Sequence, residues 1–191
     1  MHKSSLAVGV FLCASTAIAH ITPNVVLVRR GEFLKESLPG ATRFFEKQLM
    51  LAGQEGAAIR QATGWSPSDE DTKVYVGRDE KGGLIGTVVF LWISSVHGPV
   101  GMGFAFKPDA RLSQAVVTDV GSEPLAWVRP LIEAGGMQTL AGLAASAKAD
   151  PERVAPSVTS PMSRYYAQVI AQGVFRAQWI ERVASERNSP R

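Results

Sequence analysis

A few side chains of this sequence have the types needed for acid–base or metal chemistry. His97 is the only histidine well inside the chain, and it stands in a polar loop between two apolar runs. No second histidine has a spacing suited to a metal, so ordinary polar contacts are favoured over metal binding or base catalysis. Asp69, Glu70 and Asp71 lack the alternation of a calcium loop and indicate a solvated acidic turn. The sequence has no G-x-S-x-G elbow, no H-E-x-x-H pair and no glycine loop that opens a helix.

Hydroxyl side chains gather just before the longest predicted helix. The segment V-T-S-P-M-S, residues 158–163, contains Thr159, Ser160 and Ser163. A simple helix start explains these residues, because serine caps helices and proline is favoured at the first helical position. The free N–H groups and the dipole of a helix start also attract phosphate, so an anion-binding role stays open. The tryptophans could stack on a flat ligand, although ordinary core and rim packing is favoured.

The composition is that of a globular protein. Of 191 residues, 46% are apolar and 19% are charged, which suits one domain with a substantial core. The net charge of +3 comes without a basic stripe interleaved with aromatics, so nucleic acid is not expected as a partner. Cys13 is the only cysteine and lies near the N-terminus. Disulfides, thiol catalysis and cysteine-based metal sites are therefore excluded from the rest of the chain.

Residues 1–19 have the pattern of a cleavable secretory signal peptide. Lys3 supplies a positive end, residues 6–18 form an apolar stretch too short to span a bilayer, and residues 17–19 read A-I-A. Cleavage after this motif would make His20 the new N-terminus, and an uncleaved anchor is the alternative. We expect a periplasmic or otherwise extracytoplasmic protein that is soluble after signal cleavage.

The middle of the chain predicts an antiparallel meander of strands joined by tight turns. Turn residues interrupt the apolar runs at 79–83 and 108–111, and a loop follows the second strand at 94–98. Such closely spaced strands are typical of a meander, since parallel pairing needs longer crossovers. The predicted strands are residues 73–78, 84–93, 101–107 and 112–119.

Helices are predicted on both sides of the meander. Ala41, Phe45 and Leu49 share one stripe of an amphipathic helix over residues 41–51, with Gly53 as its stop. Before it lie a short strand or tether at 24–28 and one or two helical turns at 32–38. The other predicted helices are residues 54–63, 125–134, 139–148 and 162–184.

The last helix is the longest and has one buried face. The residues spaced for that face are Tyr166, Val169, Ile170, Gly173, Ala177 and Ile180. The predicted fold class is α+β, an antiparallel meander packed with N-terminal helices and a long C-terminal helix. The predicted divisions are a signal peptide (1–19), an N-terminal extension (20–38), a single domain (39–185) and a polar tail (186–191).

The element order and several short motifs resemble the FMN-binding domain of bacterial exported electron-transfer proteins. This family includes the flavinylated subunits of Rnf and Na+-translocating quinone reductase complexes. The matching motifs are Gly98-Pro99, Pro108-Asp109 and Glu123-Pro124, and the match runs from about Pro39 to about Phe175. The resemblance implies the same fold, a flavin cofactor, and a membrane redox complex or another exported redox protein as partner.

In this family the threonine of an S-G-A-T-S/T motif before the last helix is esterified to FMN phosphate. Here Thr159 and Ser163 fit the outer positions, whereas Ser160, Pro161 and Met162 replace Gly, Ala and the acceptor Thr. A thioether has no hydroxyl to form a phosphoester, so covalent attachment is not expected. The resemblance then implies non-covalent FMN held by Thr159, Ser160, Ser163 and Glu123.

The sequence thus favours an exported FMN-binding-like domain associated with extracytoplasmic electron transfer. The alternative is a flavin-free interaction or assembly subunit that keeps the fold. A hydrolytic enzyme is a weaker third reading, because no hydrolase motif supports it. Whether the chain is an enzyme stays open, and at most it is an electron-transfer component.

Overall fold

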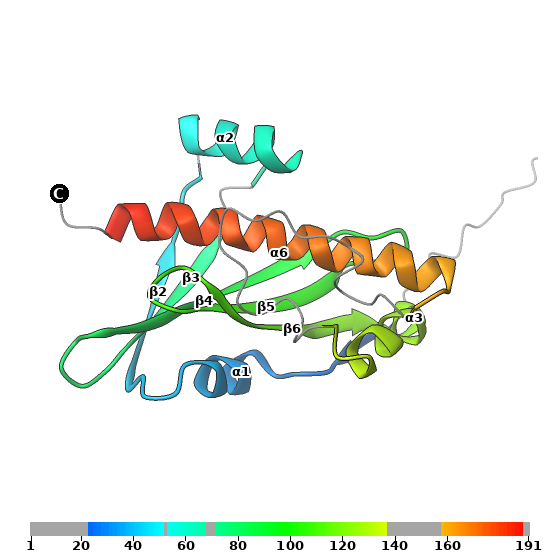
Figure 1. Ribbon diagram of the computed structural model, residues 1–191, viewed down its shortest axis with the longest axis horizontal. Coiled ribbons are helices and arrows are strands. Elements are labelled where there is room, and N and C mark those ends of the chain that lie inside the picture. The colour runs from blue at the N-terminus through cyan, green and yellow to red at the C-terminus, as the bar shows by residue number, and fades with distance from the viewer. Residues whose placement is uncertain (1–22, 52, 68–71, 137–157, 189–191) are drawn as a thin grey trace, which may run out of the picture.

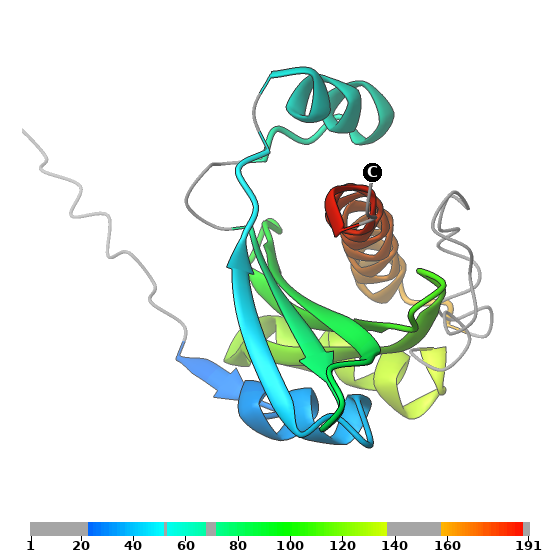
Figure 2. The same cartoon turned by 90° about the vertical axis from the view of Figure 1, so that its left-hand side faces the viewer.

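Six strands form one curled antiparallel sheet with helices on both faces (Figures 1 and 2). The computed structural model describes residues 23–51, 53–67, 72–136 and 158–188. The strands are β1 (Asn24–Val26), β2 (Arg43–Gln48), β3 (Lys73–Arg78), β4 (Leu84–Ile93), β5 (Val100–Phe106) and β6 (Leu112–Gly121). Their order in the sheet is β1-β6-β5-β4-β3-β2, so each strand from β2 to β5 pairs with the next along the chain, and β6 also pairs with β1. The predicted α+β fold and its antiparallel meander are confirmed.

Tight turns set the register of the meander. In the turn after β3, the N–H of Asp79 donates to the carbonyl of Gly83 at 3.0 Å. In the turn after β5, the N–H of Lys107 donates to the carbonyl of Arg111 at 2.9 Å. Such short connections can only join antiparallel neighbours. The strands predicted from β3 to β6 are therefore present, with ends that differ from prediction by two residues at most.

The long helix α6 (Pro161–Asn188) lies along one face of the sheet, and α1 (Arg30–Ser37) covers the other (Figures 1 and 2). The predicted buried stripe of α6 is confirmed, because its members face the sheet within the main core. Its buried side chains are Tyr166, Val169, Ile170, Ala177 and Ile180. A smaller cluster on the opposite face packs Phe33 and Leu38 against Val88 and Ala105.

The amphipathic helix predicted for residues 41–51 is wrong, since this segment contains the edge strand β2. All six residues of β2 pair with β3, and Glu46 forms an ion pair with Lys73 at 2.8 Å and accepts a hydrogen bond from Tyr75 at 3.0 Å. Ala41, Phe45 and Leu49 also fit a two-residue alternation, so the helical stripe did not exclude a strand. Pairing with β3 decides the outcome.

The helix α2 (Gly53–Thr63) confirms the prediction for 54–63, but Gly53 begins this helix instead of ending the one before it. Figure 1 shows α2 on the same side of the sheet as α6. Arg187, near the end of α6, forms an ion pair with Glu55 of α2 and donates a hydrogen bond to the carbonyl of Met50 at 2.9 Å. This arginine fastens α2 to the last turns of α6.

The helix α3 (Ser122–Glu133) follows β6 without a loop and begins three residues before its predicted start. The helix α6 continues to Asn188, so the predicted polar tail is helical over its first residues. An Arg182–Glu186 ion pair at 3.1 Å supports these last turns.

Some predictions concern residues outside those described. They are the signal peptide at 1–19, the N-terminus at His20, the acidic turn at 69–71 and the helix at 139–148. Within the described segments, no helix combines the length and apolar character needed to cross a bilayer.

Candidate functional site

The loop between β4 and β5, residues 94–99, is shaped by its own hydrogen bonds. The hydroxyl of Ser95 donates to the carbonyl of Gly98, and the N–H of Gly98 donates to the carbonyl of Ser95 at 3.3 Å. Gly98 has a φ of 106°, a backbone region that residues with a Cβ rarely adopt. The turn places Val96 at the loop surface, where it is 71% exposed, and leaves His97 half-buried.

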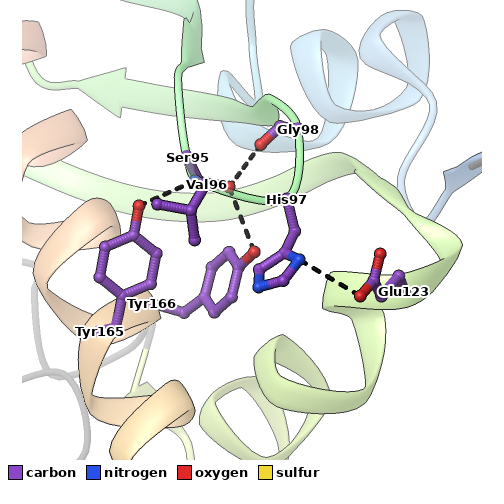
Figure 3. Close-up of polar contacts among 7 residues, drawn as sticks. All are labelled: Ser95, Val96, His97, Gly98, Glu123, Tyr165 and Tyr166. Atoms are coloured by element: carbon purple, nitrogen blue, oxygen red, sulfur yellow. Dashed lines mark hydrogen bonds and ion pairs between the residues drawn. The ribbon is translucent and has the colours of Figure 1, made fainter. Parts of the chain in front are cut away.

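The first turns of α6 hold this loop from one side (Figure 3). The N–H of Val96 donates to the hydroxyl of Tyr165 at 3.0 Å, and the hydroxyls of Ser95 and Tyr166 share a hydrogen bond at 3.1 Å. Burial raises the pKa of Tyr166, so its hydroxyl keeps its proton at neutral pH. The two tyrosines therefore fix the loop to the start of the long helix.

His97 joins the loop to the start of α3 (Figure 3). Its Nδ1 atom lies 3.2 Å from a carboxylate oxygen of Glu123, and both side chains are partly exposed. The imidazole packs against the indole of Trp127 with centroids 4.8 Å apart, and Trp127 stacks on Tyr166 at 5.9 Å. The rings of His97, Trp127 and Tyr166, which come from the loop, α3 and α6, are therefore connected by a continuous series of ring contacts.

A pocket of about 370 Å³ opens beside the same loop. Trp92 lies at its wall and is 45% exposed, and the guanidinium of Arg30 sits 5.2 Å from the centroid of its indole ring. His97 belongs both to this pocket and to the bridge with Glu123. The lining residues are Asn24, Trp92, His97, Gly98, Pro99 and Gly121.

The residues predicted to hold a cofactor differ in accessibility. Glu123 is exposed and engaged with His97, and Thr159 and Ser160 are exposed just before α6. Ser163 is only 2% exposed, so in this conformation its hydroxyl is closed to a ligand in solvent. Met162 is partly buried and packs against the main core.

The predicted helix start at this segment is present. Pro161 is the first residue of α6, and the carbonyl of Ser160 accepts a hydrogen bond from the N–H of Arg164 at 2.9 Å, as expected for a helix start.

Sequence reasoning missed how these segments meet. The loop with His97, the motif with Glu123 and the tyrosines at the start of α6 were each visible in the sequence. The residues in contact lie 26 to 71 positions apart along the chain. A local sequence pattern cannot indicate contacts between residues so far apart in sequence. The sequence does not separate Trp92 from the other tryptophans, for which core and rim packing is favoured, whereas the structure leaves it 45% exposed.

The assembled site offers flat rings, hydroxyls, a carboxylate and an imidazole at one end of the sheet. Such groups suit the binding of a planar polar ligand. Among the described residues, no group of three or more His, Cys, Asp or Glu side chains could hold a metal ion.

Comparison with known proteins adds no relative. No family model, no curated protein and no solved structure matches the chain.

Proposed function

We propose that this chain is an exported domain that binds FMN without a covalent bond and serves electron transfer outside the cytoplasm. The observation that carries the proposal is the meeting of three motif-bearing segments that lie far apart in the sequence. Loop 94–99 contacts the start of α6 through Tyr165 and Tyr166 and the start of α3 through Glu123. Two of these segments carry the motifs Gly98-Pro99 and Glu123-Pro124 of the resemblance, and the third directly follows segment 158–163, while Pro108-Asp109 lies apart in the turn after β5.

The chemistry of the site suits both ends of FMN. The indole of Trp92 lies at the wall of the pocket and is 45% exposed, so an isoalloxazine ring can stack there beside the Arg30 guanidinium. The start of α6 provides free N–H groups and the positive end of a long helix dipole, with the exposed residues Thr159 and Ser160 beside it. A phosphate group is the natural ligand for such a helix start.

A flavin-free interaction or assembly subunit is the second candidate, and a specific observation favours it. Ser163 is buried, Met162 packs into the core, and Glu123 is already paired with His97. The polar groups around the helix start are thus partly satisfied within the chain. On this alternative the fold persists while the cofactor has been lost.

Titration of FMN with the purified protein, followed by flavin fluorescence, tests the proposal. We expect saturable binding, and weaker binding of riboflavin because it lacks the phosphate. Trp92→Ala should weaken FMN binding roughly two- to tenfold, since an aromatic stacking contact contributes about 0.5–1.5 kcal/mol. Phe45→Ala is a matched control, because Phe45 is 44% exposed on β2 at the opposite edge of the sheet. Equal affinities of the two variants would count against this site, and absence of FMN binding would favour the flavin-free alternative.

A second prediction is that FMN does not become covalently attached. Met162 has no hydroxyl, and the hydroxyls of Thr159 and Ser163 stand three and one positions from the acceptor position. On a helix start, such a displacement turns a side chain in a different direction. Intact-mass measurement after co-expression with a flavin transferase should give the unmodified mass. An FMN adduct that survives denaturation would contradict the prediction.

The triple variant Ser160→Gly, Pro161→Ala and Met162→Thr is the positive control for that experiment. It restores the hydroxyl acceptor and removes the proline ring and the serine Cβ, neither of which the family's motif has at these positions. If the resemblance is correct, the transferase should label this variant. A folded variant that stays unlabelled would count against the resemblance itself.

A further inference from the structure

The carboxyl group of Glu181 is buried between α6 and the sheet. Glu181 is 2% exposed, and Thr87 of β4, which is 4% exposed, donates a hydrogen bond to its Oε2 atom at 2.5 Å. Ser185, one turn further along α6, donates to its Oε1 atom at 2.8 Å. The carboxyl group thus ties the C-terminal half of α6 to the middle of the sheet.

Burial and the hydroxyls of Thr87 and Ser185 determine the pKa of this carboxyl group, and no charged residue of the described segments shifts it. On α6 itself, Arg182 pairs with Glu186, Arg187 pairs with Glu55 of α2, and Arg176 lies over the ring of Trp65. Besides Thr87, the strands β3, β4 and β5 contribute apolar side chains to the core that they share with α6. These side chains are Val74 and Val76 of β3, Val89, Leu91 and Ile93 of β4, and Met102, Phe104 and Phe106 of β5.

Ionisation of a carboxyl group in such a place is unfavourable, because burial removes water and no positive charge replaces it. Burial accordingly raises the pKa of Glu181 above its ordinary value of 4.5, and the hydrogen bonds from Thr87 and Ser185 offset only part of that shift. The folded chain therefore binds this proton more tightly than the unfolded chain does.

We propose that Glu181 is a proton-dependent latch, which fastens the C-terminal half of α6 to β4 as the neutral acid and loosens it when the carboxyl group ionises. Because Arg187 of the same turns holds Glu55 and the carbonyl of Met50, loosening of these turns also frees α2. The first half of α6, which carries the tyrosine contacts to loop 94–99, lies outside the latch.

The sign of the effect follows from the raised pKa. The stabilisation is complete below the unfolded value near 4.5 and is lost as pH rises through the folded pKa. Between these two values, the equilibrium constant for local opening increases about tenfold for each pH unit, and above the folded pKa it levels off.

Hydrogen exchange of the full chain at pH 5 and pH 8, corrected for intrinsic chemical exchange, tests the latch. We expect protection of residues 174–188 and 53–63 to fall between these pH values, while residues 161–173 change less. Glu181→Gln should remove the difference, because an amide cannot ionise and can still contact both hydroxyls, with its oxygen accepting from one and its nitrogen donating to the other. Glu186→Gln, an exposed change one turn away, should behave like the unaltered protein. The same pH dependence in Glu181→Gln and the unaltered protein would overturn the proposal.

A second measurement needs no variant. Infrared titration of the unaltered protein should reveal a protonated carboxyl band that persists after the exposed carboxyl groups have ionised and then disappears as protection falls. If all carboxyl groups ionise together near the ordinary value, Glu181 is not the latch.

Discussion

Ile170→Ala should lower the free energy of unfolding by about 2–5 kcal/mol, the largest effect that we expect from a single substitution. Ile170 is completely buried on the face of α6 that packs against the sheet, within the main core. Truncation removes apolar contacts and leaves a cavity that a long helix fixed along the sheet cannot easily close. Denaturant melts followed by circular dichroism measure the change.

Gln168→Ala is the matched control, since Gln168 lies on the exposed face of the same helix. This substitution should leave stability within about 0.5 kcal/mol of the unaltered protein. A loss near zero for Ile170→Ala, or equal losses for both variants, would mean that the buried face of α6 is assigned incorrectly.

Gly86→Ala should destabilise the protein by about 1–3 kcal/mol through overpacking. A Cβ at this position of β4 would lie 2.4 Å from the backbone carbonyl oxygen of Phe106 on β5 and 2.7 Å from the Leu38 side chain. Gly77, its partner on β3, would meet the same leucine at 2.7 Å. The two glycines thus leave the space that the Leu38 side chain occupies just after α1. The backbones of β3 and β4 cannot move away from this side chain without disturbing the sheet.

Gly31→Ala separates this steric effect from a general effect of replacing glycine. Gly31 lies in α1, and an added Cβ would meet no heavy atom within 4 Å. Alanine favours helix over glycine by roughly 0.5–1 kcal/mol, so this variant should be slightly more stable. If thermal melts place Gly86→Ala at or above the stability of the unaltered protein, the close approach of β4 and β5 is wrong.

Local signals were sufficient for most of the sheet and for α6. The strands from β3 to β6 are separated by tight turns at 79–83 and 108–111, and each turn constrains the strands on both sides. The apolar period of α6 extends over many turns, so its buried face could be predicted residue by residue. Patterns of this kind depend on neighbours that are close in sequence.

Such local signals do not determine whether segment 41–51 forms a helix or a strand. Its short apolar pattern fits both a helix and a strand, and the choice depends on pairing between Arg43–Gln48 and Lys73–Arg78, some thirty residues away. Edge strands are also exposed on both faces, and Phe45 on β2 is 44% exposed. A clear alternation of buried and exposed positions is therefore missing here.

The sequence indicated the segments that make up the candidate site, but it did not predict the contacts between them. His97, Glu123 and Tyr165 each stood in segments that the sequence marked, and Tyr166 was correctly placed in the core. Their hydrogen bonds and ring contacts depend on how the loop, α3 and α6 come together at one end of the sheet. Tertiary packing alone determines that arrangement.

The flavin content of the protein tests the proposed function most directly. The protein should be purified from an exporting host, equilibrated with FMN, passed through a desalting column and then denatured, with absorbance and released flavin measured at each step. We expect a yellow protein that retains FMN up to an equimolar amount and releases all of it on denaturation. A folded protein that stays colourless and retains no more FMN than the Trp92→Ala variant would show that the chain does not bind FMN at this site.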